Sequence, residues 1–232
     1  MDPRVVSSRV VDPVVSPEGN EYTPGNIVTL IQRARLEDGR EVMFQAPSVV
    51  ALNLIEAKKK LDRALRDRDR YLKSLKEDAR YGAWMSKRDD LLLDVFARLT
   101  EAVLLSFVAI EGMANAAVSE LPKDATVWVE RTGQKVRIQK DEMERRLSTA
   151  EKLDLVLPIA TGLSTIKGTV AWEAFVRMRM IRDDLVHMTD RGYSNEPDDP
   201  SPYGRLLRGE GDRCVEDARL VISKAWPAWV PS

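Results

Sequence analysis

The pattern of hydrophobic and polar positions predicts one β-hairpin near the start of the chain and a series of helices after it. Residues 1–25 are rich in Val, Ser and Pro without a clear period, which indicates an extended arm. In residues 26–45, Asp38 and Gly39 separate two runs of β-favouring residues, as expected for a hairpin with a two-residue turn. Pro47 ends this segment.

Helical spacing begins after Pro47. Leucines recur at helical intervals across residues 48–78, and charged side chains of both signs fill most of the other positions. The run "KKKLDRALRDRDR" is therefore typical of a solvated helix face rather than of an RNA clamp. A second long helix is expected from Ser86, where "SKRD" has the form of a capping box, to just before Pro122. Its predicted apolar face consists of Leu92, Phe96, Leu99, Val103, Phe107, Ile110, Ala114 and Ala117.

The second half of the chain predicts a further hairpin and three helices. The stretch "TVWVERTGQKVRIQ" indicates strands that turn near Thr132 and Gly133. Helices are expected at 140–156, stopped by Pro158, at 169–188 and at 212–225, with loops at 160–168 and 191–204. The expected fold class is all-α, an antiparallel helical bundle with an N-terminal β-hairpin and a short inserted β-hairpin at about 126–139. The expected domains are an arm and hairpin (1–47), the bundle (48–225) and a C-terminal tail (226–232).

Composition narrows the functional classes. Apolar residues make up 44% of the 232 residues, as in a protein with a real core, and the net charge of −1 gives no overall field for nucleic acid or membranes. A local basic site remains open. The single cysteine and single histidine provide no cluster with zinc-ligand spacing, so we expect no metal and no cofactor. Without a leader or a membrane-spanning apolar stretch, the chain is expected to be cytoplasmic.

The helix expected at 169–188 has two unlike faces. Ala174, Met178, Ile181, Leu185 and Met188 form one apolar stripe at spacings of four and three residues. The opposite side carries Trp172, Val176, Arg179, Asp183, Val186 and His187. A surface helix normally has one apolar face, so this second face indicates burial against a neighbouring helix or, in our preferred interpretation, against a partner chain.

The only histidine of the chain lies at the end of this helix, in "IRDDLVHM". Asp183 is four residues before His187, so the two side chains share a face and can hydrogen-bond. Arg182 is five residues before His187 and points about 140° away around the helix. A structural interpretation is also available, in which the helix dipole favours His187, Asp183 is its surface partner and Arg182 covers the edge of the core.

An arginine, a polar residue, three further residues and a histidine near the end of a late helix resemble the motif of the HEPN superfamily, R-x4–6-H. The segment "RDDLVH" matches at Arg182, Asp183 and His187, with Asp in place of the commoner Asn. The stretch "LLSFVAIEGMANAAV" is similar to the corresponding helix of Apea-like and related members, with Glu111 and Asn115 on one face. The segment "EKLDLVLP" is also similar, and the likeness spans about residues 86–187.

The resemblance implies a HEPN-like bundle that forms a homodimer, commonly a metal-independent endoribonuclease in toxin–antitoxin or antiphage defence. We therefore expect an RNA substrate and a composite site containing Arg182 and His187 from both protomers. Asp183 would orient the imidazole, Arg179 would offset nearby acidic charge, and Glu111 and Asn115 would support the site or serve a purely structural role. An antitoxin or another protein partner is also expected, whereas no membrane contact is.

The chemistry of RNA cleavage suits these residue types. Imidazole can transfer protons near neutral pH, and a guanidinium can stabilise charge on phosphoryl oxygens. The alternative is a non-catalytic HEPN helical module that binds a partner protein, a nucleotide or RNA. Asp183, Asp184 and Asp190 favour this alternative, because acidic side chains repel a phosphate backbone.

Overall fold

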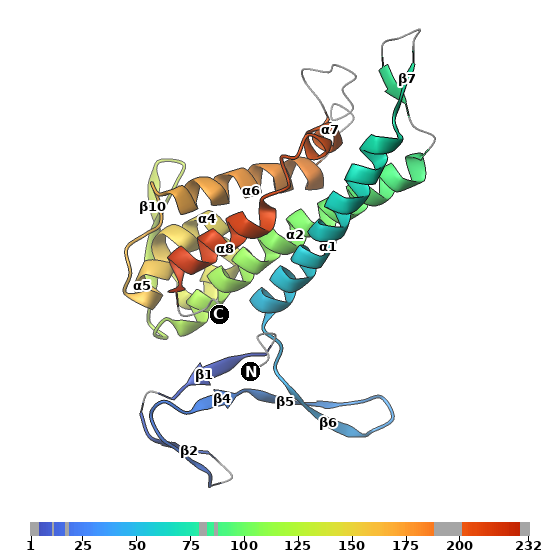
Figure 1. Cartoon of the computed structure of the whole chain (residues 1–232). Helices are drawn as coiled ribbons and strands as arrows, with labels where there is room; N and C mark the ends of the chain where they lie inside the picture. Colours follow the sequence, from blue (N-terminus) through green and yellow to red (C-terminus); the bar gives the residue numbers. More distant parts are fainter. Residues whose placement is uncertain are drawn as a thin grey trace. The chain divides into compact units, whose positions relative to one another are not determined.

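The computed structural model describes residues 5–10, 12–16, 19–78, 83–85, 88–187 and 201–227. The chain forms two compact units, residues 1–52 and 53–232, and the division falls near the start of helix α1 (Val49–Ser74). The protein is mostly helical and carries small antiparallel hairpins, which agrees with the expected helical bundle (Figure 1). Within the described ranges, no helix combines the length and the apolar character needed to cross a membrane.

The first unit is built from three short antiparallel strand pairs. These are β1 (Ser7–Arg9) with β4 (Ile27–Thr29), β2 (Val14–Val15) with β3 (Glu21–Tyr22), and β5 (Ile31–Arg35) with β6 (Glu41–Gln45). The turn between β5 and β6 contains Asp38 and Gly39, as predicted. The predicted two-residue length is wrong, because the N–H of Leu36 donates to the carbonyl of Arg40 and three residues lie between them. Gly39 ends this turn with a φ of 85°, which suits glycine.

Helix α1 opens the helical unit and buries one side. Its buried apolar residues recur every three or four positions and include Val50, Leu54, Ala57, Leu61 and Ala64. The helix ends at Ser74, so the predicted continuation to Asp78 is wrong. Instead, the chain forms β7 (Lys76–Asp78), which pairs with β8 (Ala83–Met85).

Helix α2 (Asp89–Glu120) is the central helix of this unit and contacts α3, α5, η1, α6, α7 and α8. The predicted face is buried from Leu99 onward, and further buried residues lie outside it, including Val95, Ala102, Ala109 and Met113. The predicted start at Ser86 is wrong, because the helix begins at Asp89 after Arg88, which makes no side-chain cap. Ser86 itself lies outside the described residues.

The inserted hairpin is confirmed. Strand β9 (Thr126–Arg131) pairs with β10 (Gln134–Gln139) in register, and Thr132 and Gly133 form the turn. Both turn residues have positive φ, 49° for Thr132 and 80° for Gly133. A two-residue turn of this kind matches the twist of the two strands.

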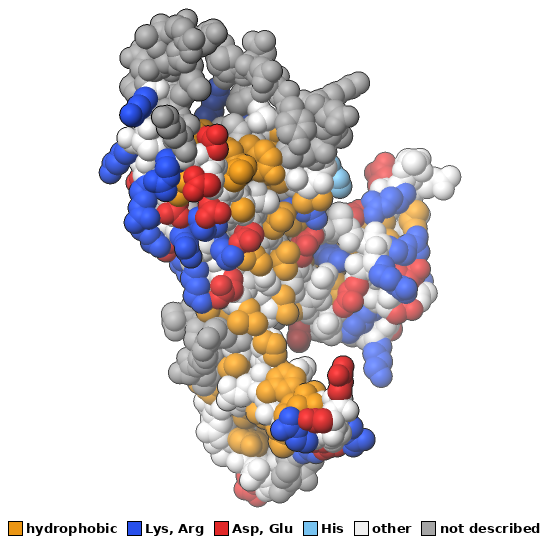
Figure 2. All heavy atoms as spheres, turned by 90° about the vertical axis from the view of Figure 1, so that its right-hand side faces the viewer, with side chains coloured by type: hydrophobic (Ala, Val, Ile, Leu, Met, Phe, Trp, Pro, Cys, Tyr) orange, Lys and Arg blue, Asp and Glu red, His pale blue; other side chains and the backbone are white. Residues whose placement is uncertain are grey.

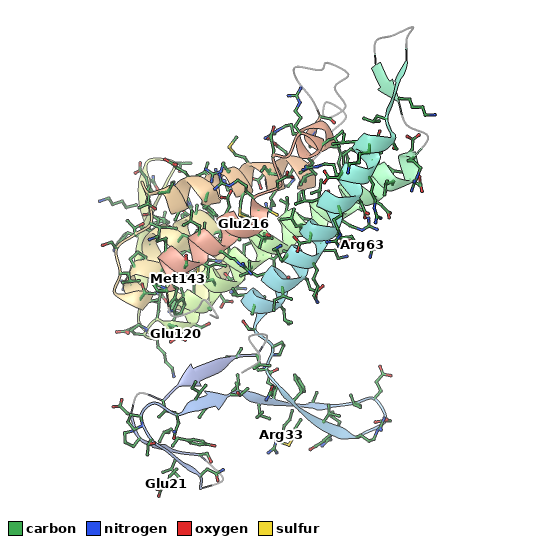
Figure 3. All side chains as sticks on the ribbon, in the orientation of Figure 1. Glu21, Arg33, Arg63, Glu120, Met143 and Glu216 are labelled. Carbon is green, nitrogen blue, oxygen red and sulfur yellow. The ribbon has the colours of Figure 1, made fainter. Side chains whose placement is uncertain are left out.

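The single helix predicted at 140–156 is wrong. The chain forms α3 (Lys140–Arg146), α4 (Thr149–Glu151), the π-helical turn η1 (Lys152–Val156) and α5 (Leu157–Thr161). Pro158 does not stop the helix but lies inside α5, directly after the wider π-helical turn. The wider turn gives the backbone more space just before Pro158, which has no N–H to donate to a helical hydrogen bond. Figure 3 labels Met143 of α3, which is fully buried.

Three helices complete the unit: α6 (Val170–Val186), α7 (Pro202–Leu207) and α8 (Cys214–Ala225). Helix α6 packs against α2 and α8, as Figure 1 shows. The predicted loop at 191–204 is wrong at its end, because Ser201 caps α7 and residues 202–204 are helical; residues 191–200 lie outside the described ranges. Cys214 is buried at the start of α8, and this burial raises the pKa of its thiol to about 12.

The carboxylate of Glu151 gives a test of this architecture. It accepts hydrogen bonds from Arg131 of β9 and from the backbone and hydroxyl of Ser148, which together lower its pKa from 4.5 to about 2. A lowered folded-state pKa contributes stability that is present above pH 4.5 and is lost as the pH falls through about 2.

We expect Glu151→Gln to lower the melting temperature at pH 7 more than at pH 2. Glu130→Gln, at an exposed position of β9, is the control, and an equal effect at both pH values would contradict this role.

Candidate functional site at the contact of α2 and α6

Helix α6 places the histidine of the motif at the molecular surface. His187 is exposed, and it is the residue that ends α6, with its backbone N–H 2.9 Å from the carbonyl oxygen of Asp183. The predicted end of the helix at Met188 lies outside the described residues.

The guanidinium of Arg182 lies between α6 and α2. Its central carbon is 4.8 Å from the centre of the Phe107 ring, which is a cation–π contact. One guanidinium nitrogen, Nη1, donates to Asp183 Oδ1 at 2.7 Å, and Nη2 is 3.5 Å from Glu111 Oε1. The side chain keeps 29% of its surface exposed. Arg182 is therefore held by three groups while it still faces solvent.

Asp183 contacts a different partner from the one expected. Its carboxylate accepts from Arg182, and no hydrogen bond joins the side chains of Asp183 and His187 within the described part of the chain. The long stem of Arg182 allows the guanidinium to turn back to the adjacent carboxylate. Asp184 is also engaged, because Arg205 of α7 donates to it. Both described aspartates thus have an arginine beside them, and Asp190 lies outside the described residues.

Glu111 and Asn115 both belong to a polar network on α2. Glu111 accepts from the hydroxyl of Thr149 at 3.2 Å in addition to its contact with Arg182. Asn115 Oδ1 accepts from Lys152 Nζ at 2.7 Å, and the same ammonium donates to the carbonyl of Glu144 at 2.8 Å. Glu111 therefore contacts the motif helix through Arg182, whereas Asn115 contacts Lys152 of η1 and not α6. Arg179 is exposed on α6 and forms no ion pair with the described residues.

Lys152 is a residue that the sequence did not single out. It is 6% exposed and lies on the π-helical turn η1. Burial lowers the pKa of its ammonium, while the carboxylates of Glu144 and Glu111 oppose that shift. The segment "EKLDLVLP" contains this lysine among apolar residues, but its partner Asn115 is 37 residues away. Nothing local in the sequence indicates that contact.

The described residues contain no group of three or more His, Cys, Asp or Glu side chains that could hold a metal ion. Comparisons with protein-family models, curated proteins and solved structures give no match for this chain. The resemblance to the HEPN superfamily stays a prediction from the motif and the order of helices.

Proposed function

We propose that this protein is a metal-independent endoribonuclease of the HEPN type. One observation carries the proposal: the only imidazole of the chain is exposed at the end of α6, five residues after a guanidinium held against α2. In RNA, the 2′-hydroxyl attacks the adjacent phosphate, the bond to the 5′-oxygen breaks, and no metal is needed. His187 would transfer a proton in this step, and Arg182 would stabilise the charge on the phosphoryl oxygens.

The proposed site combines two protomers. Each chain offers one imidazole, whereas cleavage needs one proton removed from the 2′-oxygen and another delivered to the 5′-oxygen. Met180 and Val186 are 53% and 51% exposed on α6, which gives the region around His187 an apolar surface that a second copy could cover. Glu111 would support the site by holding Arg182, and Asn115 by holding Lys152.

The first test is cleavage of RNA by the purified full chain in EDTA. We expect products with 2′,3′-cyclic phosphate and 5′-hydroxyl ends, unchanged by the chelator. The double variant Arg182→Ala/His187→Ala is expected to be inactive, while Arg219→Ala, at an exposed position of α8, keeps full activity. Loss of cleavage with EDTA, or an active double variant, would overturn the proposed mechanism. Measurement of the mass in solution tests the dimer separately.

A non-catalytic RNA- or partner-binding module is the second candidate. The observation that favours it is the double engagement of Arg182 by the carboxylates of Asp183 and Glu111. A phosphate would have to compete with both. In the same assay, this candidate gives RNA or protein binding without any cleaved product.

A further inference from the structure

The basic side chains of α1 fall into two groups with different partners. The helix carries eight Lys and Arg residues against four Asp and Glu residues. Two of the basic residues join α1 to other elements: Lys60 pairs with Glu101 of α2, and Arg68 is 2.6 Å from Asp212. In addition, Asp67 of α1 accepts from Arg98 of α2 at 2.7 Å. These pairs fix α1 against the rest of the helical unit.

Five of the other basic residues lie on one exposed face, which we call the α1 basic stripe. They are Lys59, Arg63, Arg66, Arg70 and Lys73, and every one is exposed. Their spacing of four, three, four and three residues places them within an arc of about 80° around the helix. At a rise of about 1.5 Å per residue, the stripe is about 21 Å long. The positive charges therefore form a line rather than a scatter.

Few strong interactions occupy the stripe. Lys59 pairs with Glu56 one turn earlier, and Arg63 and Arg70 are 4.0 and 3.4 Å from Asp67. That carboxylate is already engaged by Arg98. Arg66 and Lys73 form no ion pair with any residue that the structure describes. Because exposed pairs contribute little, the stripe can exchange its present contacts for those of a ligand.

The opposite side of α1 is closed to ligands, since its apolar residues are buried in the helical unit. Figure 2 shows basic and acidic side chains interspersed along one side of this unit, and Figure 3 labels Arg63 on α1. A membrane-binding helix inserts its apolar face between lipids, and in α1 that face is not available. The ligand that suits the α1 basic stripe is a polyanion whose negative charges repeat at regular intervals.

The sequence alone indicated a solvated helix face for the run "KKKLDRALRDRDR", but the folded helix gathers its exposed basic side chains on one face. We therefore propose that the α1 basic stripe binds the phosphate backbone of RNA, outside the site around His187. This inference rests on the proposed function only for the choice of RNA. Phosphates repeat every few ångströms along a nucleic-acid strand, so a stripe about 21 Å long faces several of them. Contacts of this kind carry no sequence information, so the stripe holds RNA of any sequence near the protein.

The test measures binding rather than cleavage, using 2′-O-methyl RNA, which lacks the attacking hydroxyl. In a fluorescence-anisotropy titration, we expect Arg66→Glu/Lys73→Glu to weaken binding about tenfold or more. The slope of log affinity against log salt should become shallower by about 1.4, the value for two lost phosphate contacts on a single strand. The matched control is Lys135→Glu/Arg137→Glu on β10, which makes the same charge change at two exposed positions.

The outcomes separate this inference from the proposed function. If the protein binds RNA through the stripe but cleaves no RNA, the result supports RNA binding by the α1 basic stripe and contradicts the proposed nuclease activity. Equal loss in the two double variants would show a nonspecific effect of charge and would overturn the inference. Binding of wild type to phosphatidylserine vesicles but not to the RNA would also overturn it. Circular dichroism melting checks that both variants fold.

Discussion

Replacement of His187 by alanine is expected to reduce the rate of RNA cleavage by about 10²–10⁴-fold, the usual contribution of a proton-transferring side chain. The melting temperature should change little, because His187 is exposed and its ring forms no hydrogen bond with the described residues. Cleavage rate under single-turnover conditions is the measurement. The expected loss is catalytic, so affinity for 2′-O-methyl RNA should stay near that of wild type.

Addition of free imidazole gives a sharper test of the same role. A small base can enter the space left by the missing ring and restore part of the rate in His187→Ala. It should not restore Arg182→Ala, which lacks the positive charge rather than the proton carrier. A His187→Ala chain that cleaves RNA at the wild-type rate would falsify the assignment of this residue, whatever happens at Arg182.

The largest expected loss of stability comes from Phe175→Ala. Phe175 of α6 is fully buried, and its ring lies 6.0 Å from the Phe107 ring and 5.3 Å from the Trp172 ring, measured between centres. Removal of a buried phenyl ring costs about 3–5 kcal/mol, because it leaves a cavity as well as losing apolar burial. For a unit of this size, that corresponds to a fall in melting temperature of roughly 6–20 °C.

The control for this substitution is Trp128→Ala on β9, where the aromatic side chain is 59% exposed. A change within about 0.5 kcal/mol is expected there.

Because Phe107 also lies under the guanidinium of Arg182, the Phe175 cavity should loosen that contact. We therefore expect Phe175→Ala to lower cleavage even below its melting transition. A melting temperature equal to that of wild type would contradict the packing described for α6.

The sequence predicted those elements whose pattern is local and regular. The long apolar periods of α1, α2 and α6 and the Thr132–Gly133 turn all have strong local signals, and the structure contains each of them. The ends of helices were less predictable. The break after α3 did have a signal, since Ser148 and Glu151 have the spacing of a capping box and form one in the structure. The π-helical turn before Pro158 had none.

The features of the candidate site were also predictable only in part. The sequence placed His187 near the end of a helix, and the structure agrees, but the exposure of the ring was left open by the sequence and is known only from the structure. The partner of Asp183 was not predictable from spacing, because i,i+4 geometry permits His187 while the flexible Arg182 is closer along the chain. Lys152 reaches Asn115 only through the packing of η1 on α2, and such a contact has no signature in either segment.

The buried start of α8 affects how the protein reacts with oxidants. Cys214 is the only sulfhydryl of the chain, and its thiol stays protonated at neutral pH. Only the thiolate reacts readily with peroxides or disulfides, so the native fold shields this sulfur twice, by exclusion of reagents and by suppression of the reactive form. Oxidants can react with the sulfur of Cys214 only after α8 separates from the helices that cover it.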